Sequence, residues 1–143
     1  MASQAIYDAI RSHLEANWTA TPLVFENEDY SALGSHSHFT LVEMAGSYFG
    51  RESIGTGDPD QDRFDEEGEI WLHMMMRANV GTRVGRGHLT NLADLFRGLK
   101  LMNDRLEFLD ARVGFGESVS QSSGNDGGWF RLSMTIDWRL IDA

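Results

Sequence analysis

The segment from Glu69 to Gly98 constrains the fold most strongly, because its hydrophobic period changes partway from that of a strand to that of a helix. In its first half two rows of side chains alternate, as expected of a β-strand: Ile70, Leu72, Met74 and Met76 against Trp71, His73, Met75 and Arg77. In its second half the apolar residues fall on one helical stripe: Leu89, Leu92, Ala93 and Phe96. The segment therefore predicts a strand, a glycine-rich turn and an amphipathic helix, and Gly98 suits the left-handed position that ends a helix.

The rest of the chain adds a second helix and further strands. Ile6, Ile10 and Leu14 recur at every fourth position, which predicts a helix over residues 3–18. Strands are predicted in four other regions, the second weakened or bent by its glycines and the third broken near Asp110: Leu23–Phe25, Phe39–Tyr48, Leu106–Phe115 and Leu132–Leu140. The order α-β-β-β-α-β-β predicts the α+β class, with a mixed or antiparallel sheet of about five strands and two helices packed on one face.

Composition narrows the class of protein. The 143 residues, 41% of them hydrophobic and 24% charged, are expected to form a single domain over residues 1–143. No apolar run approaches the roughly 18 residues that cross a bilayer, and the N-terminus lacks the pattern of a signal peptide, so we expect no membrane partner. The chain has no cysteine, which excludes disulfides and thiolate chemistry and favours assembly in a reducing cytoplasm.

Negative charge is concentrated in one part of the chain. Between Glu26 and Glu69 there are twelve acids and two bases, a net charge of −10 that equals the charge of the whole protein. Between Arg77 and Arg112, seven bases and four acids give a net charge of +3. Such a chain is not expected to wrap nucleic acid, which needs a basic face. The densest acidic part predicts a long loop over about residues 50–68, for which a solvated surface loop is the simpler interpretation.

The carboxylates of this loop have the spacing of a calcium-binding loop but lack its other features. Asp58, Asp60 and Asp62 are followed by Glu69 at the twelfth position of the motif. Arg63, however, stands where a glycine must make the sharp turn, and no helix is predicted before the motif. We therefore expect a solvated acidic loop here rather than a calcium site.

The remaining motifs are weak indications of a ligand or a reaction. His36 and His38 would share one face of a strand, but zinc needs three or four ligands and the other histidines are scattered. The turn Gly81-Thr-Arg-Val-Gly85-Arg-Gly87 lacks both the lysine of a P-loop and the spacing of a dinucleotide-binding motif. The sequence contains no nucleophile elbow and no carboxylate pair in apolar surroundings. We therefore expect neither a cofactor nor enzymatic activity.

Two sets of residues are candidates for contacts between subunits. Trp71 and His73 lie on the side of their strand that faces away from the predicted core, an amphipathic pattern that fits a protein interface. The alternative is that Trp71, His73 and Met75 belong to a second, smaller core on that face. Arg83 and Arg86 lie in the only basic stretch and are candidates for pairing with the acidic loop of an adjacent subunit.

The pattern as a whole resembles the tail-terminator-like proteins of long-tailed bacteriophages and prophages. The resemblance covers nearly the whole chain and rests on five segments in order: the opening helix Ala5–Trp18, the edge Tyr48–Glu52, the strand Gly68–Met76, the helix ending Leu92–Gly98 and the closing strand Trp129–Leu132. The order of elements and the passage from strand into helix carry the match, rather than a strict signature motif.

This resemblance implies a non-enzymatic virion protein, assembled in the host cytoplasm and located in the tail. Copies would form a ring, commonly a hexamer, that caps the tail-tube protein and presents the surface for joining the head and its connector proteins. DNA would pass through the ring without sequence-specific binding. The acidic residues then become candidates for the lumen or for the interface between subunits: Asp58, Asp60, Asp62, Asp65, Glu66 and Glu67. The alternatives are another head-completion or tail-tube protein, or a calcium-binding module.

Overall fold

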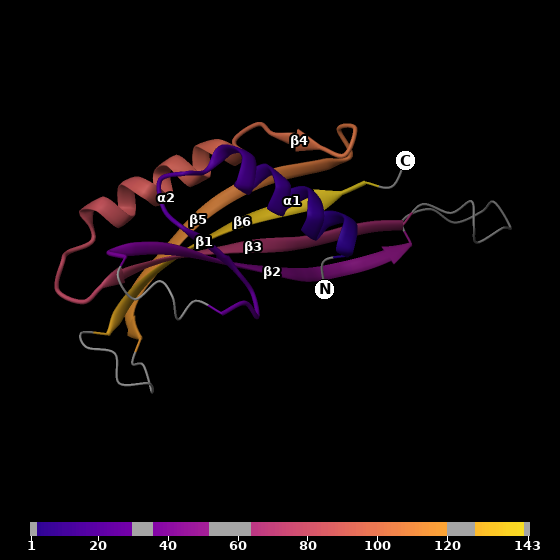
Figure 1. Cartoon of the computed structure of the whole chain (residues 1–143). Helices are drawn as coiled ribbons and strands as arrows, with labels where there is room; N and C mark the ends of the chain where they lie inside the picture. Colours follow the sequence, from indigo (N-terminus) through magenta and orange to yellow (C-terminus); the bar gives the residue numbers. More distant parts are fainter. Residues whose placement is uncertain (1–2, 30–35, 52–63, 120–127, 142–143) are drawn as a thin grey trace, which may run out of the picture.

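The computed structural model describes residues 3–29, 36–51, 64–119 and 128–141 (Figure 1). These residues form two helices and six strands: α1 (Gln4–Asn17), β1 (Leu23–Phe25), β2 (His38–Arg51), β3 (Phe64–Arg77), α2 (Arg83–Phe96), β4 (Lys100–Leu101), β5 (Leu106–Val119) and β6 (Trp129–Leu140). Neither of these helices is long and apolar enough to cross a bilayer. The predicted α+β class is confirmed, and the short strand β4 is the one element that the sequence pattern missed.

The strands form one mixed sheet in the order β1-β2-β3-β6-β5-β4. β1 runs parallel to β2, and all the other neighbouring pairs are antiparallel. The two strands with the clearest alternation in sequence, β3 and β6, are the innermost pair. Their position explains the pattern, because a central strand with different environments on its two faces must alternate along its whole length.

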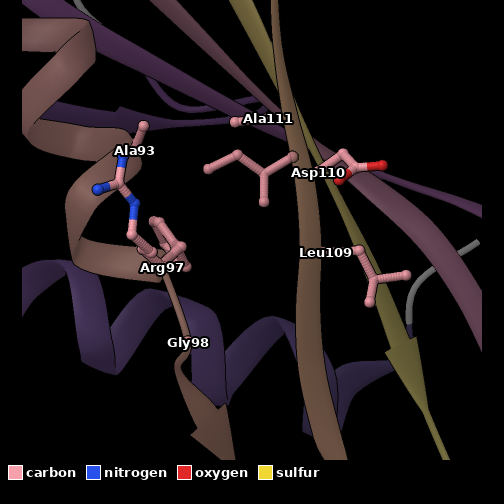
Figure 2. Close-up of a pocket in the computed structure, with 8 residues that line it drawn as sticks. Ala93, Arg97, Gly98, Leu109, Asp110 and Ala111 are labelled. Carbon is pink, nitrogen blue, oxygen red and sulfur yellow. The ribbon is translucent and has the colours of Figure 1, made fainter.

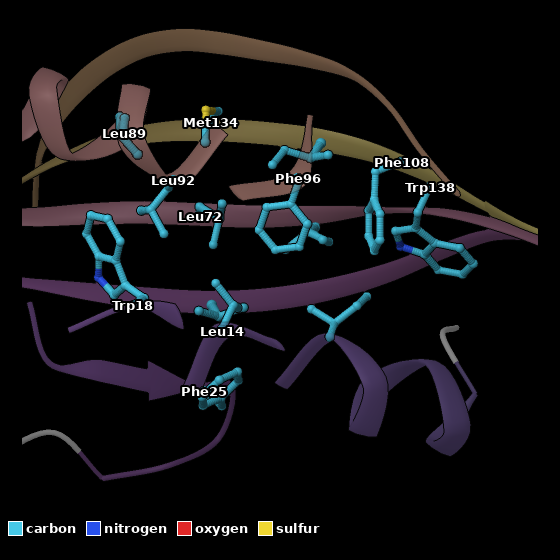
Figure 3. Packing of buried hydrophobic residues seen from close by; sticks show 14 of the residues in the cluster. Leu14, Trp18, Phe25, Leu72, Leu89, Leu92, Phe96, Phe108, Met134 and Trp138 are labelled. Atoms are coloured by element: carbon cyan, nitrogen blue, oxygen red, sulfur yellow. The ribbon is translucent and has the colours of Figure 1, made fainter. Parts of the chain in front are cut away.

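Both helices cover the same face of the sheet, as predicted, and we call this the inner face (Figure 1). The buried residues of α1 and α2 are those of the two predicted helical stripes: Ile6, Ile10, Leu14, Leu89, Leu92 and Phe96. They pack on the inward rows of β3 and β6, which include Leu72, Met134 and Trp138. Figure 3 shows Leu14, Leu72, Leu92 and Phe96 gathered between the helices and the strands. The helical and strand stripes thus meet in one core.

Glycines set the position and the end of α2. The helix begins at Arg83, so Gly85 lies inside its first turns, where an added Cβ would collide with Met76 Cε and approach Met74 Cγ to 3.3 Å. Gly85 therefore allows α2 to pack closely on β3. At the other end, Gly98 has a φ of +67°, which confirms its predicted left-handed position after the helix.

The predicted loop over residues 50–68 is too long. β2 continues to Arg51 and β3 begins at Phe64, so Asp65, Glu66 and Glu67 are strand residues that pair with β2. The sequence misplaced the start of β3 because acidic residues are depleted in strands. In the structure, Arg139 of β6 lies opposite Glu67 and compensates its charge. Residues 52–63 lie outside the described part of the chain.

Irregular pairing bends two of the long strands. The register of β2 against β3 shifts between Gly46 and Tyr48, near one of the glycines expected to bend this strand. The register of β5 against β6 shifts between Phe108 and Ala111, where the sequence predicted a break near Asp110, and again between Val113 and Gly116. Such bulges bend a strand and increase its twist.

Candidate functional site

The outer face of the sheet, opposite the helices, carries a second and smaller core. Four residues are buried together there: Val24, Phe39, Met75 and Trp129. The rings of Phe39 and Trp129 meet edge to face with their centroids 4.8 Å apart, and the Arg77 guanidinium lies over the Trp129 ring at 4.2 Å. The alternative interpretation of this face as a small core is therefore confirmed for Met75.

Next to this small core, three strands bring an acid, a histidine and a serine into one line, which we call the polar row. His73 of β3 lies between Glu43 of β2 and Ser133 of β6. Its Nδ1 is 2.6 Å from Ser133 Oγ, and its Nε2 is 3.3 Å from Glu43 Oε1. The row depends on strand register, because His73 is the direct partner of Ser133 in the β3–β6 ladder.

The protonation of the polar row follows from the burial of His73. Burial lowers the pKa of His73 below its ordinary value of 6.5, and the Glu43 carboxylate opposes this shift only in part. The imidazole is therefore neutral at neutral pH and carries a single N–H. We assign that hydrogen to Nε2, which donates to Glu43, so that Nδ1 accepts from the Ser133 hydroxyl. Both ring nitrogens are then satisfied.

Trp71 covers one side of the polar row and is itself partly exposed. Its indole stacks on the His73 imidazole with ring centroids 6.0 Å apart and an interplanar angle of 25°. Trp71 nevertheless remains 37% exposed. A hollow of about 310 Å³ beside it is also lined by Arg131 and Glu43. An exposed aromatic ring that shares a hollow with a cation and a carboxylate forms a surface that suits a protein partner.

The polar row contains the three residue types of a catalytic triad, but its surroundings favour a structural role. Ser133 lies in the middle of β6, which has strand neighbours on both sides, so the backbone amides around it lie in the plane of the sheet. Acyl transfer requires N–H donors aimed at the oxyanion that forms beside the serine. His73 is also only 5% exposed. We interpret the row as a satisfied polar network on the outer face.

The three described residues of the acidic cluster divide between the two faces of the sheet. Arg139 contacts both Asp65 and Glu67, with Nη2 3.5 Å from Asp65 Oδ2 and Nε 3.7 Å from Glu67 Oε1. Glu66 instead accepts a hydrogen bond of 3.3 Å from the backbone N–H of Ser3, the N-cap residue of α1. A carboxylate at this position stabilises the helix dipole, and the first turn of α1 has no acid of its own. All three residues thus have contacts within the subunit, and their role in a lumen or interface stays a prediction.

The two pairs of predicted interface residues lie on different elements. Arg83 and Arg86 belong to α2, whereas Trp71 and His73 lie on the outer face of β3. Both arginines are exposed near the start of the helix, and Arg86 Nε donates to Thr82 Oγ1 at 3.1 Å. Within the described part of the chain we find no carboxylate partner for either guanidinium. The predicted interface residues therefore form two separate surfaces.

The candidate metal ligands are not brought together in the part of the chain that the structure describes. His38 begins β2, and its ring meets that of His88 of α2 with centroids 5.6 Å apart; burial, and then the His88 charge, lower the pKa of His38. His36 precedes the strand and is exposed. No group of three or more histidines and acids in the described ranges is placed to hold a metal ion. Asp58, Asp60 and Asp62 lie outside those ranges.

Sequence reasoning missed Glu43, Ser133 and Arg131 as neighbours of the predicted pair Trp71 and His73. A signal was present, because Ser133 and Arg131 alternate with the apolar row of β6 and so had to lie on the outer face. Their proximity to His73, however, depends on which strands are neighbours and in what register, and a single sequence does not give these.

Comparison with known proteins bears on the fold only. Neither a protein-family model nor a curated protein matches the chain. Several chains of solved structures match, and one of them is similar over nearly the whole length, with a TM-score of 0.62 at 14% sequence identity and coverage of 98% of this chain and 96% of that one. At this identity the likeness shows a shared fold, and a fold by itself does not define a function.

Proposed function

We propose that this protein is a ring-forming structural component of a long-tailed phage, a tail terminator that caps the tail tube and forms the surface to which the head is joined. The observation that carries the proposal is the unequal covering of the sheet. Helices cover the inner face, whereas the outer face presents the exposed ring of Trp71 beside Arg131 and Glu43. An amphipathic surface of this kind is typical of contacts between subunits.

The charge distribution supports assembly of identical copies. The acids are concentrated between Glu26 and Glu69, whereas Arg83 and Arg86 lie on α2. A contact between two different surfaces of identical subunits closes into a ring when the rotation between neighbours permits it. Six copies are the number that the family resemblance implies, and the ring would sit in the virion tail after assembly in the host cytoplasm.

The proposed role needs no catalytic group and no cofactor. In this role the polar row provides hydrogen-bond partners for the buried ring nitrogens of His73, which Trp71 covers. DNA would pass through the ring without sequence-specific contacts, since the net charge of −10 repels the phosphate backbone. A neighbouring virion component, either a tail-tube or a head-completion protein, is the alternative within the same class of protein.

The test uses the tail-tube protein encoded by the same phage or prophage. Tubes are polymerised with and without this protein and are examined by electron microscopy. We expect tubes to stop growing and to carry a single closed ring at one end. Trp71→Glu should abolish capping because it replaces the exposed apolar ring of the outer face by a carboxylate, whereas Asn91→Glu, at an exposed position of α2, should cap normally.

Two results would contradict the proposal. If tubes reach the same length distribution in the presence of the wild-type protein, the terminator function is wrong. If the protein alone polymerises into stacked rings, it is the tube protein instead.

A further inference from the structure

On the outer face, the hollow of about 310 Å³ beside Trp71 contains more negative than positive charge. Glu26 and Glu43 line it together with a single cation, Arg131. Arg131 also has contacts of its own within the chain, and His73, which is neutral at neutral pH, adds no charge. The hollow therefore keeps an excess of negative charge beside the exposed part of an aromatic ring.

The local structure holds both carboxylates at the hollow without neutralising them. Glu26 directly follows β1, and its Oε2 accepts a hydrogen bond of 3.1 Å from the backbone N–H of Met44. Glu43 Oε1 accepts from His73 Nε2 at 3.3 Å. Within the described residues, neither carboxylate contacts a lysine or an arginine. Both are therefore available to a cation that approaches from another molecule.

A guanidinium group suits an indole ring that lies beside carboxylates. Its plane stacks on an aromatic face, and its N–H groups donate to carboxylate oxygens at the same time. The hollow is also accessible, because β1 pairs with β2 only as far as Val42 and no strand among the described residues covers the edge of β2 beside Glu43. Its volume is at the lower end of the range for ligand pockets, about 300–1,000 Å³. It is therefore suited to one or two side chains.

The turn before α2 has the complementary chemistry. Arg83 begins the helix, and Val80 and Val84 on either side of it in the sequence are 57% and 56% exposed. Arg83 is itself exposed and has no carboxylate partner within the described residues. An exposed arginine between two exposed valines matches an aromatic ring that lies beside exposed carboxylates.

The other arginines in and after α2 contact groups of their own subunit. Figure 2 shows Arg97 and Asp110, which line a common groove between α2 and β5, and Arg97 also contacts Asp94 at 3.2 Å. Arg86 lines the adjoining part of this groove and donates a hydrogen bond to the N-cap residue of the helix. Among the described residues, Arg83 is thus the arginine of α2 that is left without such a contact.

We propose that the hollow beside Trp71 binds Arg83 of a second copy of this chain, whose Val80 and Val84 cover the exposed part of the indole ring. The inference rests on the proposed ring and identifies one contact between its subunits. Arg83 cannot reach the hollow of its own subunit, because α2 covers the inner face of the sheet (Figure 1) and the hollow opens on the outer face. A contact between two different surfaces leaves each copy able to bind the next one.

Two charge-reversal variants and their mixture test this contact by analytical ultracentrifugation of the full chain. Arg83→Glu changes the incoming side chain, and Glu26→Lys changes the hollow; both positions are exposed. We expect each variant alone to associate at least tenfold more weakly than the wild type. An equal mixture should recover the association. In the mixture, the two introduced charges are complementary, and the unchanged arginine of one variant meets the unchanged hollow of the other.

Matched controls separate this contact from a general effect of net charge. Lys100→Glu on β4 changes the net charge as much as Arg83→Glu, and Asp8→Lys on α1 changes it as much as Glu26→Lys. Both control positions are exposed, so both controls should associate like the wild type. Circular dichroism checks that every variant is folded, and recovery in the mixture is a second check.

Three results would overturn the proposal. In the first, Arg83→Glu alone associates as tightly as the wild type. In the second, the mixture associates no more tightly than its components, so that another surface joins the copies. In the third, the wild type remains monomeric at every concentration. The capping experiment decides the proposed function separately, because it uses the wild-type chain and the tube protein.

Discussion

At the scale of single residues, the polar row shows how a buried histidine is accommodated on the outer face. The His73 ring makes a hydrogen bond through each nitrogen and is covered by the Trp71 indole. A buried polar atom left without a partner costs about 1–3 kcal/mol, so the row stabilises the fold mainly by avoiding that cost. The same burial makes the row sensitive to pH.

The first prediction concerns the titration of His73. Its pKa in the folded protein should lie below 6.5, because burial disfavours the imidazolium ion. The unfolded chain then binds the proton more readily than the folded protein. The contribution of His73 to stability is therefore complete above pH 6.5 and is lost as the pH falls from 6.5 toward the folded pKa.

NMR titration of the imidazole carbon-bound protons measures this pKa directly. Glu43→Gln serves as the comparison, since removing the carboxylate that raises the pKa should move the midpoint further down. A wild-type midpoint at or above 6.5 would contradict the burial argument.

At the scale of elements, α2 covers part of the inner face and leaves a groove between itself and β5. Its buried stripe, which includes Leu89 and Leu92, fixes the helix on the sheet, and Gly85 permits the close approach to β3. Arg86 of α2, and Arg97 directly after the helix, consequently line this groove. Any change that shifts the helix would therefore also change the groove.

The second prediction contrasts two glycines of similar exposure near α2. Gly98 has a φ of +67° with open space around it, so Gly98→Ala should destabilise the protein by about 1 kcal/mol through backbone strain alone. Gly87 also has open space but lies inside the helix, so Gly87→Ala should stabilise the protein by about 0.5–1 kcal/mol. Urea unfolding of the two variants measures both values, and changes of the same sign would show that the helix ends elsewhere.

At the scale of the whole molecule, the fold separates its charges. The acidic residues of β3 lie near one end of the central strands, and the arginines of α2 lie on the inner face at another place. Asp65 and Glu67 are compensated by Arg139 within the subunit, whereas Arg83 and Arg86 have no carboxylate partner among the described residues. The unpaired arginines are consistent with the proposed association of copies.

The third prediction is that duplex DNA does not bind this protein at physiological salt. Binding by counter-ion release requires a basic face that neutralises several phosphates, whereas the chain carries a net charge of −10. Electrophoretic mobility-shift assays should show free DNA at all protein concentrations. A shift that disappears with rising salt would reveal a basic surface strong enough to overcome the net charge, and passive passage of DNA would then be wrong.

Periodicity in the sequence predicted most of the elements and their inward faces, because burial of one side leaves a local pattern. The stripe of α2, the alternation of β3 and β6, and the break in β5 near Asp110 were all visible in this way. The start of β3 at Phe64 was not visible in the sequence pattern. The acids that follow Phe64 are accommodated through contacts with Arg139 and with the N-terminus of α1. Those contacts join residues far apart in the chain.

By itself, therefore, the sequence determined the α+β class, the two helices on one face and the uneven distribution of charge. The first two follow from local hydrophobic periodicity, and the third from counting charged residues along the chain. Only the tertiary structure decided that Glu43, His73 and Ser133 form one row, and that α2 leaves a groove beside β5. Strand order, register and helix placement set these features, and they arise from the packing of the whole chain rather than from any local pattern.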